Sequence, residues 1–563
     1  MHGRIKVKTT AEQQEAKRKE REKKLQLFNG ATHKAFKKRT NEEYDNEALE
    51  ITGQLLTANS DFTTMWNYRK EVLLHYKEEK KPEEMEAIFK KELSFLESCL
   101  RQNPKSYGVW HHRCFVMDTM PNPDWSLELT LCNKFLEYDE RNFHCWDYRR
   151  FVVQRSKVAT QDEVEFTNTK ISSNFSNFSS WHYRSKLLPI LYPDPEKRER
   201  VKEDILHKEY ELVQNAFFTD PNDQSAWFYH RWLLGRAEQP QDIRCLYVNT
   251  KTQQIVISLT NAIHLKKVHA KVIINNSEIQ TSWWTPNKKD SFTTVWICEF
   301  PVQSLNKTAN NSIIVSIEDS DVQRSCTLKE GEVECWSKDS RPETIFSSVL
   351  SAETTTVLQD ELDSCQQLQE LEPENKWCLL TILFLMRALD PMRYEKQTLE
   401  YLTTLDKVDS YRLQYYRDLR SKFIIENTIS RMSTSDTREI NLCNKDLSCL
   451  YHTDHMILET AVDVSANQLS ALRHCFMLQA VQKLKADDNK INNIGDVINL
   501  PMLQELSIQN NCLTTMEDLS ALTSCNNLSV LHLQGNPVCE VPDFNGKVKT
   551  LLPQLQQLNG NEL

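Results

Sequence analysis

The first half of the chain alternates apolar helical stretches with short polar turns, and a tryptophan follows each turn. These tryptophans recur every 35 to 46 residues, and an Asn or Asp stands seven positions before each of them. Periods of this size are typical of helical-hairpin repeats, in which the turn ends one helix and caps the next. One hairpin cannot bury its apolar face, so the pattern predicts hairpins that stack on one another. The tryptophans are Trp66, Trp110, Trp146, Trp181 and Trp227, and the turn residues are Asn59, Asn103, Asp139, Asn174 and Asp220.

An arginine stands three positions after four of these tryptophans, so both side chains lie on one helix face. We expect each tryptophan to fill the seam between neighbouring hairpins and each arginine to reach a carboxylate or carbonyl in the adjoining turn. In the fifth copy the arginine, Arg231, comes one position late. A weaker sixth copy, at 370–389, has a turn two residues shorter and lacks the arginine. The four arginines are Arg69, Arg113, Arg149 and Arg184.

Between 241 and 345 the pattern changes to short strands. Runs such as Ile255, Ile257 and Leu259 alternate with polar residues at roughly ten-residue spacing, which predicts an antiparallel, immunoglobulin-like β-sandwich. Cys326 and Cys335 flank a glycine turn in this segment, and we expect both to be reduced. The helical pattern resumes over 346–437.

The segment 438–563 carries a third period. Leucines and an Asn recur in the spacing of leucine-rich repeats, and in a degenerate first repeat Lys445 takes the place of the Asn. We expect these asparagines to bind backbone groups inside a solenoid. They are Asn467, Asn489, Asn511 and Asn536. The fold class predicted is therefore multidomain and mainly α: a crescent of stacked hairpins over 1–240 and 346–437, an inserted sandwich and C-terminal leucine-rich repeats.

Composition limits the function. The net charge of −10 disfavours generic nucleic-acid binding, and a mean hydropathy of −0.58 with no long apolar run indicates no membrane span. The 16 cysteines form no C-x-x-C pair, and the chain starts MHGRIKVKTT without an apolar signal segment, so we expect a reduced, cytoplasmic protein. No metal-ligand cluster, phosphate-binding loop or nucleophile motif stands out. The chain therefore looks like a scaffold, or a subunit that lends side chains to a site built elsewhere.

The stretch NPKSYGVWHHR at 103–113 resembles the repeat of protein prenyltransferase α subunits. The order of hairpins, sandwich and leucine-rich repeats resembles the branch of that family that modifies Rab GTPases. The resemblance implies a heterodimer with a barrel-shaped β subunit, which holds zinc and the lipid pocket. The substrates implied are geranylgeranyl diphosphate and Rab GTPases whose C-terminal cysteines are presented by an escort protein.

The resemblance also assigns roles to residues of this turn. Lys105 occupies the position whose lysine contacts the leaving diphosphate, and Tyr107 the position that lines the mouth of the active site. Gly108 stands where members that read a CaaX box have a glutamine, which puts CaaX recognition in doubt. His2 is a separate hypothesis: its imidazole could cap the zinc of the partner and inhibit it, or it is an ordinary terminal residue.

Two other functions stay open. One is a non-catalytic helical-repeat adaptor, which the absence of the 34-residue tetratricopeptide period disfavours. The other is the α subunit of a CaaX prenyltransferase, which the sandwich, the leucine-rich repeats and Gly108 disfavour.

Overall fold

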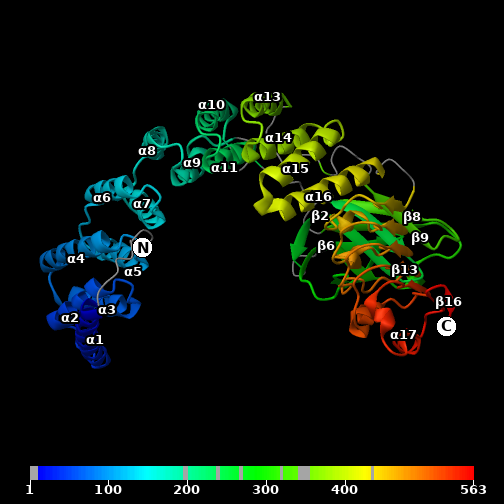
Figure 1. Ribbon diagram of the computed structural model, residues 1–563, viewed down its shortest axis with the longest axis horizontal. Helices are drawn as coiled ribbons and strands as arrows, with labels where there is room; N and C mark the ends of the chain where they lie inside the picture. The colour runs from blue at the N-terminus through cyan, green and yellow to red at the C-terminus, as the bar shows by residue number, and fades with distance from the viewer. Residues whose placement is uncertain are drawn as a thin grey trace. The chain divides into compact units, whose positions relative to one another are not determined.

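The computed structural model describes residues 11–194, 201–235, 241–264, 270–317, 321–339, 346, 355–432 and 437–563 (Figure 1). It divides into two compact units, Met1–Ala216 with Asp223–Tyr229, and Phe217–Asn222 with His230–Leu563. The predicted order of helical repeats, β insertion, further helices and leucine-rich repeats is confirmed.

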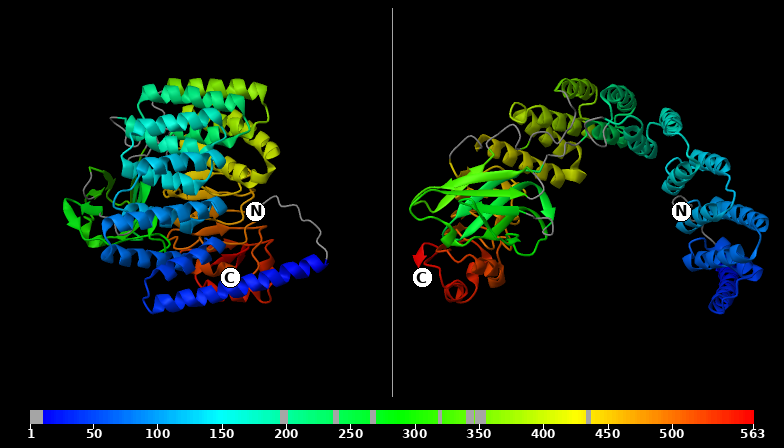
Figure 2. Two further views of the ribbon diagram at one scale, coloured as in Figure 1. Left: turned by 90° about the vertical axis from the view of Figure 1, so that its left-hand side faces the viewer. Right: turned by 180° about the vertical axis from the view of Figure 1, so that it is seen from behind.

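From residue 46 onward the N-terminal helices form successive antiparallel pairs, which one longer helix precedes and of which the last is divided between the two units. The left panel of Figure 2 shows them as parallel rows, from blue to cyan. They are α1 (Ala11–Thr40), α2 (Asn46–Ala58), α3 (Thr63–Glu79), α4 (Pro82–Gln102), α5 (Tyr107–Thr119), α6 (Trp125–Tyr138), α7 (Phe143–Ser156), α8 (Thr160–Ser173) and α9 (Phe178–Leu191), followed by α10 (Glu203–Thr219) and α11 (Gln224–Leu234).

The Asn or Asp of each turn has one shared structural task. Its side-chain Oδ1 accepts the backbone N–H two residues later, which fixes the turn in an Asx conformation. The distances are 3.2 Å at Asn59, 3.3 Å at Asn103, 3.2 Å at Asp139, 3.0 Å at Asn174 and 3.1 Å at Asp220. Either residue type serves here, because both offer this oxygen.

The sixth hairpin consists of α13 (Thr355–Leu371) and α14 (Lys376–Leu389). Asn375 caps α14 by accepting from the N–H of Trp377 and of Cys378, as Asn142 caps α7 by accepting from His144 and Cys145. The equivalence puts Leu379, not Trp377, in the tryptophan position of the repeat, which explains the turn that looked two residues short. Two more helices, α15 (Glu395–Val408) and α16 (Leu413–Met432), follow.

The insertion is a sandwich of two antiparallel sheets, with strand orders β5-β6-β2-β1-β9 and β4-β3-β7-β8. Its core includes Ile255, Ile257 and Leu259, as the alternation predicted. Cys326 and Cys335 are free thiols whose Sγ atoms lie 3.1 Å apart. The strands are β1 (Ile243–Asn249), β2 (Gln254–His264), β3 (Ala270–Ile274), β4 (Ser277–Ile279), β5 (Trp283–Trp284), β6 (Phe292–Glu299), β7 (Asn311–Ile317), β8 (Gln323–Leu328) and β9 (Glu334–Lys338).

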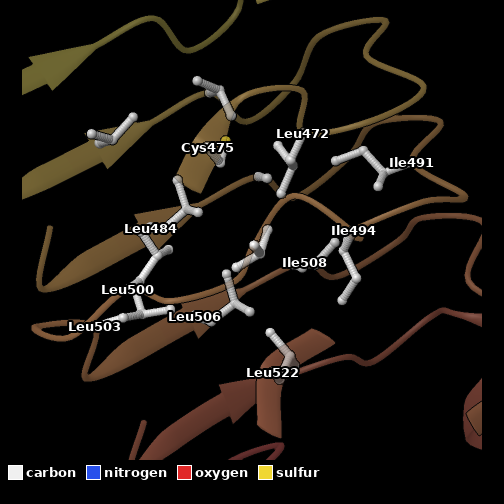
Figure 3. Close-up of a cluster of buried hydrophobic side chains, with 14 of the residues drawn as sticks. Leu472, Cys475, Leu484, Ile491, Ile494, Leu500, Leu503, Leu506, Ile508 and Leu522 are labelled. Carbon is white, nitrogen blue, oxygen red and sulfur yellow. The ribbon is translucent and has the colours of Figure 1, made fainter. Parts of the chain in front are cut away.

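The C-terminal repeats form a parallel sheet of short strands. Figure 3 shows Leu484 and Leu506, paired at the centres of neighbouring strands, pointing into one apolar cluster with Leu500 and Leu503. The strands are β10 (Glu439–Asn441), β11 (Ala461–Asp463), β12 (Lys483–Lys485), β13 (Glu505–Ser507) and β14 (Val530–His532), extended by β15 (Gln557–Leu558) and the antiparallel β16 (Asn561–Glu562).

The repeat asparagines bind backbone groups inside the solenoid, as the sequence predicted. Asn467 is the clearest case: its Oδ1 accepts from the N–H of Leu447 at 2.9 Å, and its Nδ2 donates to the carbonyl of Val464 at 2.8 Å. Asn489, Asn511 and Asn536 make equivalent contacts.

Sandwich and leucine-rich repeats share a buried interface. Tyr247, Val256 and Ile297 of the first sheet form one apolar cluster with Ile457 and Leu458 of the repeats. Polar contacts surround the cluster, including the ion pair of Arg244 with Asp454 at 3.2 Å and the pair of Arg438 with Glu334. The sequence predicted the sandwich and the leucine-rich repeats as two segments, and the structure packs them against each other.

Candidate functional site at the hairpin edge

The repeated tryptophans are buried and lock the turns. The indole Nε1–H of the first four donates to the carbonyl of the residue six positions earlier, inside the turn that precedes the tryptophan. These carbonyls belong to Ser60 for Trp66, Pro104 for Trp110, Glu140 for Trp146 and Phe175 for Trp181, at 2.8 or 2.9 Å. Trp227 is buried as well. The first four tryptophans therefore each hold the turn that precedes them.

The repeated arginines bind buried glutamates on the first helix of the next hairpin rather than groups of the adjoining turn. Arg113 donates from Nε and Nη2 to the two oxygens of Glu128, at 2.7 and 2.6 Å. Such a bidentate pair satisfies both planar groups and fixes their geometry. The other pairs are Arg69 with Glu92, Arg149 with Glu163 and Arg184 with Glu209.

A Tyr or His on the helix that follows the glutamate completes the site around Glu92, Glu128 and Glu209. Tyr148 donates its hydroxyl to Glu128 at 2.6 Å, and His112 lies 2.9 Å from Glu92. Burial alone would raise the pKa of Glu92, but the guanidinium of Arg69 and the hydrogen bond of His112 outweigh it and lower the pKa to about 2. Each glutamate thus ties three consecutive helices together, which assigns the repeated Trp and Arg residues to stability.

Lys105 differs from these buried cations. It lies in the turn between α4 and α5 with 66% of its side chain exposed, and its Nζ is 3.2 Å from Oδ2 of Asp139 in the next turn. Tyr107, the first residue of α5, is 70% exposed and meets the ring of His144 edge-on, with centroids 4.2 Å apart. Lys105 and Tyr107, to which the family resemblance assigned roles at the active site, are therefore both accessible.

Packing against the preceding repeat explains why position 108 is a glycine. A Cβ at this position would lie 2.6 Å from both Cδ1 and Nε1 of Trp66 and 3.1 Å from the carbonyl oxygen of Ser60. The indole of the preceding repeat therefore fills the space that a side chain after Tyr107 would need. This contact excludes a glutamine at position 108 unless Trp66 moves.

Exposed aromatic residues lie at the same end of the following hairpins as Lys105, directly after the turns; we call this end the hairpin edge. Phe143 and Phe178 are, like Tyr107, the first residues of second helices, and Phe228 lies in the first turns of α11. Tyr107 contacts Phe143 with centroids 6.0 Å apart, and Phe178 contacts Phe228 at 6.2 Å. Sequence reasoning missed this row, although the aromatic residue three positions before Trp110, Trp146 and Trp181 was a signal for it.

One group in the described part of the chain has metal-ligating side chains close together. It consists of His452, Asp454 and His455, whose ligand atoms lie within 4.8 Å of one another. The guanidinium of Arg244 already donates to Asp454 and contacts His455, and Nε2 of His452 lies 3.1 Å from Glu426. The guanidinium of Arg244 therefore already supplies a positive charge to this cluster. We assign the cluster to the structural junction between the sandwich and the repeats. His2 lies outside the described residues.

The comparisons with known proteins agree with this architecture. Protein prenyltransferase alpha subunit repeats match residues 89–120, 125–156, 160–191 and 206–237, a Rab geranylgeranyl transferase alpha-subunit insert domain matches 243–341, and a leucine-rich repeat model matches 425–562. The first set coincides with the hairpins from α4–α5 to α10–α11. Fold and repeat together define a protein prenyltransferase α subunit.

Full-length relatives narrow the class. Geranylgeranyl transferase type-2 subunit alpha of Rattus norvegicus and that of Homo sapiens are each 49% identical over 565 residues, covering 99% of this chain and all of each relative. The protein of the same name from Dictyostelium discoideum is 40% identical over 236 residues, which are 42% of this chain and 75% of that protein. The chain belongs to the family of geranylgeranyl transferase type-2 α subunits, and the resemblance seen in the sequence is confirmed. Among its described helices, none is long and apolar enough to cross a membrane.

Proposed function

We propose that this chain is the α subunit of a heterodimeric enzyme that transfers geranylgeranyl groups from geranylgeranyl diphosphate to C-terminal cysteines of Rab GTPases presented by an escort protein. The names of the full-length relatives support the reaction class, and the name of the matching insert domain supports the Rab substrate. The free thiols of all 16 cysteines support a cytoplasmic location, since reducing compartments keep thiols unpaired.

One observation carries the assignment of the site: Lys105 and Tyr107 are exposed together, while the repeat cations Arg69, Arg113, Arg149 and Arg184 are buried in ion pairs. Exposed aromatic side chains are enriched where proteins meet partners, so the row at Tyr107, Phe143 and Phe178 supports a β subunit bound along this edge. Such a partner would bring its lipid pocket beside Lys105.

The role proposed for Lys105 is to stabilise the negative charge that develops on the leaving diphosphate. As the bond between the prenyl carbon and the diphosphate breaks, negative charge grows on the leaving group. The ammonium of Lys105 is a compact donor that stabilises this charge as it develops. Tyr107 would line the mouth through which the acceptor peptide enters. Zinc held by the β subunit would lower the pKa of the acceptor cysteine and so favour its thiolate.

Co-purification tests the proposal. The chain is coexpressed with a barrel-type prenyltransferase β subunit, and transfer of labelled geranylgeranyl is measured with a Rab–escort complex and with a CaaX peptide. Formation of a heterodimer that modifies the Rab in the Rab–escort complex, and does not modify the CaaX peptide, supports the proposal. A heterodimer that modifies the CaaX peptide without an escort would favour the CaaX alternative, and failure to bind the β subunit would favour an adaptor.

A further inference from the structure

Consecutive turns of the first unit are joined by the second polar atom of the repeated Asn or Asp. Asn103 donates from Nδ2 to Oγ of Ser60 at 3.1 Å, and Asn174 donates from Nδ2 to Oε2 of Glu140 at 2.8 Å. In both cases the partner belongs to the preceding turn and is an acceptor. A donor amide is therefore the matching group.

The turn before Asp139 offers a donor instead, because it carries Lys105. Here the repeated residue is an aspartate, and its Oδ2 forms an ion pair with Nζ of Lys105 at 3.2 Å. Oδ1 of Asp139 is held at the same time by the N–H of Arg141 at 3.2 Å. The turn therefore fixes the carboxylate through Oδ1, and Oδ2 faces the lysine.

The fold does not need this charge. An Asn makes the same Asx turn at positions 59, 103 and 174, so an amide would suffice for the structure at 139. We propose that Asp139 is a positioning residue, which holds the ammonium of Lys105 at the hairpin edge where the diphosphate would leave. The inference rests on the proposed function and adds a residue to its site.

The physical effect is on the conformations of an exposed side chain. A lysine has many rotamers in water, and ordering it during the reaction costs conformational entropy. One ion pair to a carboxylate fixed by the backbone orders the lysine beforehand. The pair is exposed, so its effect is small and falls as salt screens it.

The test uses intact heterodimers and single-turnover transfer to a Rab–escort complex. Asp139→Asn keeps the turn and removes the charge, and Asp220→Asn is the matched control, since the equivalent residue of the turn before it is Ser176. An exposed ion pair corresponds to about a 2- to 5-fold effect, so Asp139→Asn should slow transfer by that factor. Asp220→Asn should match wild type. The deficit of Asp139→Asn should shrink as salt rises.

A double-mutant cycle with Lys105→Ala separates the possible results. If Asp139 acts through Lys105, Asp139→Asn adds nothing in the Lys105→Ala background. The inference is overturned if Asp139→Asn equals or exceeds the wild-type rate, or slows Lys105→Ala further. A normal rate for Lys105→Ala removes both this inference and the proposed role of the lysine, whereas a slow Lys105→Ala with a normal Asp139→Asn removes this inference alone.

Discussion

Nε2 of His230 lies 2.6 Å from Oε2 of Glu361, although 131 positions separate the two residues. His230 stands three positions after Trp227, where four other copies of the repeat have arginine, and Glu361 lies on the first helix of the next hairpin. The whole β-sandwich is thus inserted between two consecutive hairpins, and the buried pair that links these hairpins is still formed. Arg231, which the sequence suggested as the displaced partner, instead lies over the ring of Phe384 at 4.9 Å.

His230→Ala should destabilise the helical repeats. Both partners are buried, and removal of one partner of a buried pair leaves the carboxylate of Glu361 without its imidazole. Loss of a hydrogen bond to a charged group costs about 1.5–3 kcal/mol. Thermal unfolding of the chain measures the loss, and Glu361→Gln, which keeps a hydrogen-bonding oxygen, should lose less. Equal stability of His230→Ala and wild type would contradict the importance of this link.

The hairpins and the solenoid could be predicted because their signals are periodic. Trp66 to Trp227 recur every 35 to 46 residues and Asn467 to Asn536 every 22 to 25 residues, so the spacing alone reveals the stacking. The glutamates could not be predicted, because Glu92, Glu128, Glu163 and Glu209 follow their arginines by 23, 15, 14 and 25 residues. These distances depend on loop and helix lengths, and only the packed fold brings the charges together.

Contacts between domains were also beyond the sequence. The apolar residues Tyr247 and Val256 fit a strand equally well whether they face solvent, a partner or the leucine-rich repeats. Lys105 could be placed through its motif, but Asp139 was only one of five turn residues. Its pairing with the lysine depends on the side chain of the neighbouring turn, which no local pattern encodes.

Gly108→Ala should destabilise the N-terminal hairpins, because the new Cβ would collide with the indole of Trp66. Overpacking of this kind costs about 1–3 kcal/mol. The matched control is Gly30→Ala on α1, where no atom lies within 4 Å of the added Cβ and helix propensity favours alanine. Differential scanning calorimetry should show a lower melting temperature for Gly108→Ala only.

The junction between sandwich and repeats should weaken in mild acid. Burial and the guanidinium of Arg244 hold the pKa of His455 well below its usual value, and Asp454 opposes them only in part. The ring is therefore neutral in the folded chain, whereas an unfolded histidine takes up a proton near pH 6.5. Stability is then lost as pH falls below about 6.5, by up to about 1.4 kcal/mol per pH unit.

Urea denaturation between pH 7.5 and 5.5 measures this slope. His455→Gln removes the titrating ring and should reduce the slope. The control is His207→Gln, at an exposed position of α10, which should leave the slope unchanged. His452 faces His455 from the same loop, with Glu426 beyond it, and both stay unchanged in the two variants. A slope unaffected by His455→Gln would assign the pH dependence elsewhere.

Deletion of the sandwich alone should harm the leucine-rich repeats. With the proposed limits 241–345 replaced by a short linker, Ile457 and Leu458 lose the apolar surface that buries them. We expect aggregation or binding of an apolar dye, and recovery when both residues are changed to glutamine. Transfer activity of the soluble heterodimer should persist, because Lys105 and Tyr107 lie in the other unit. An inactive but intact and soluble heterodimer would contradict this expectation.

Lys105→Ala should slow transfer without preventing assembly. The contact to the leaving diphosphate strengthens as charge develops, so its loss acts on the transition state. A charge-assisted hydrogen bond of about 1.5–3 kcal/mol corresponds to a roughly 10- to 150-fold lower single-turnover rate. Lys105→Arg should recover part of the rate, because it keeps the charge but not the shape. Trp110→Ala, which removes a buried indole, should instead impair folding or assembly. A Lys105→Ala heterodimer within about twofold of wild type, far below the expected loss, would return Lys105 to the class of solvated surface charges.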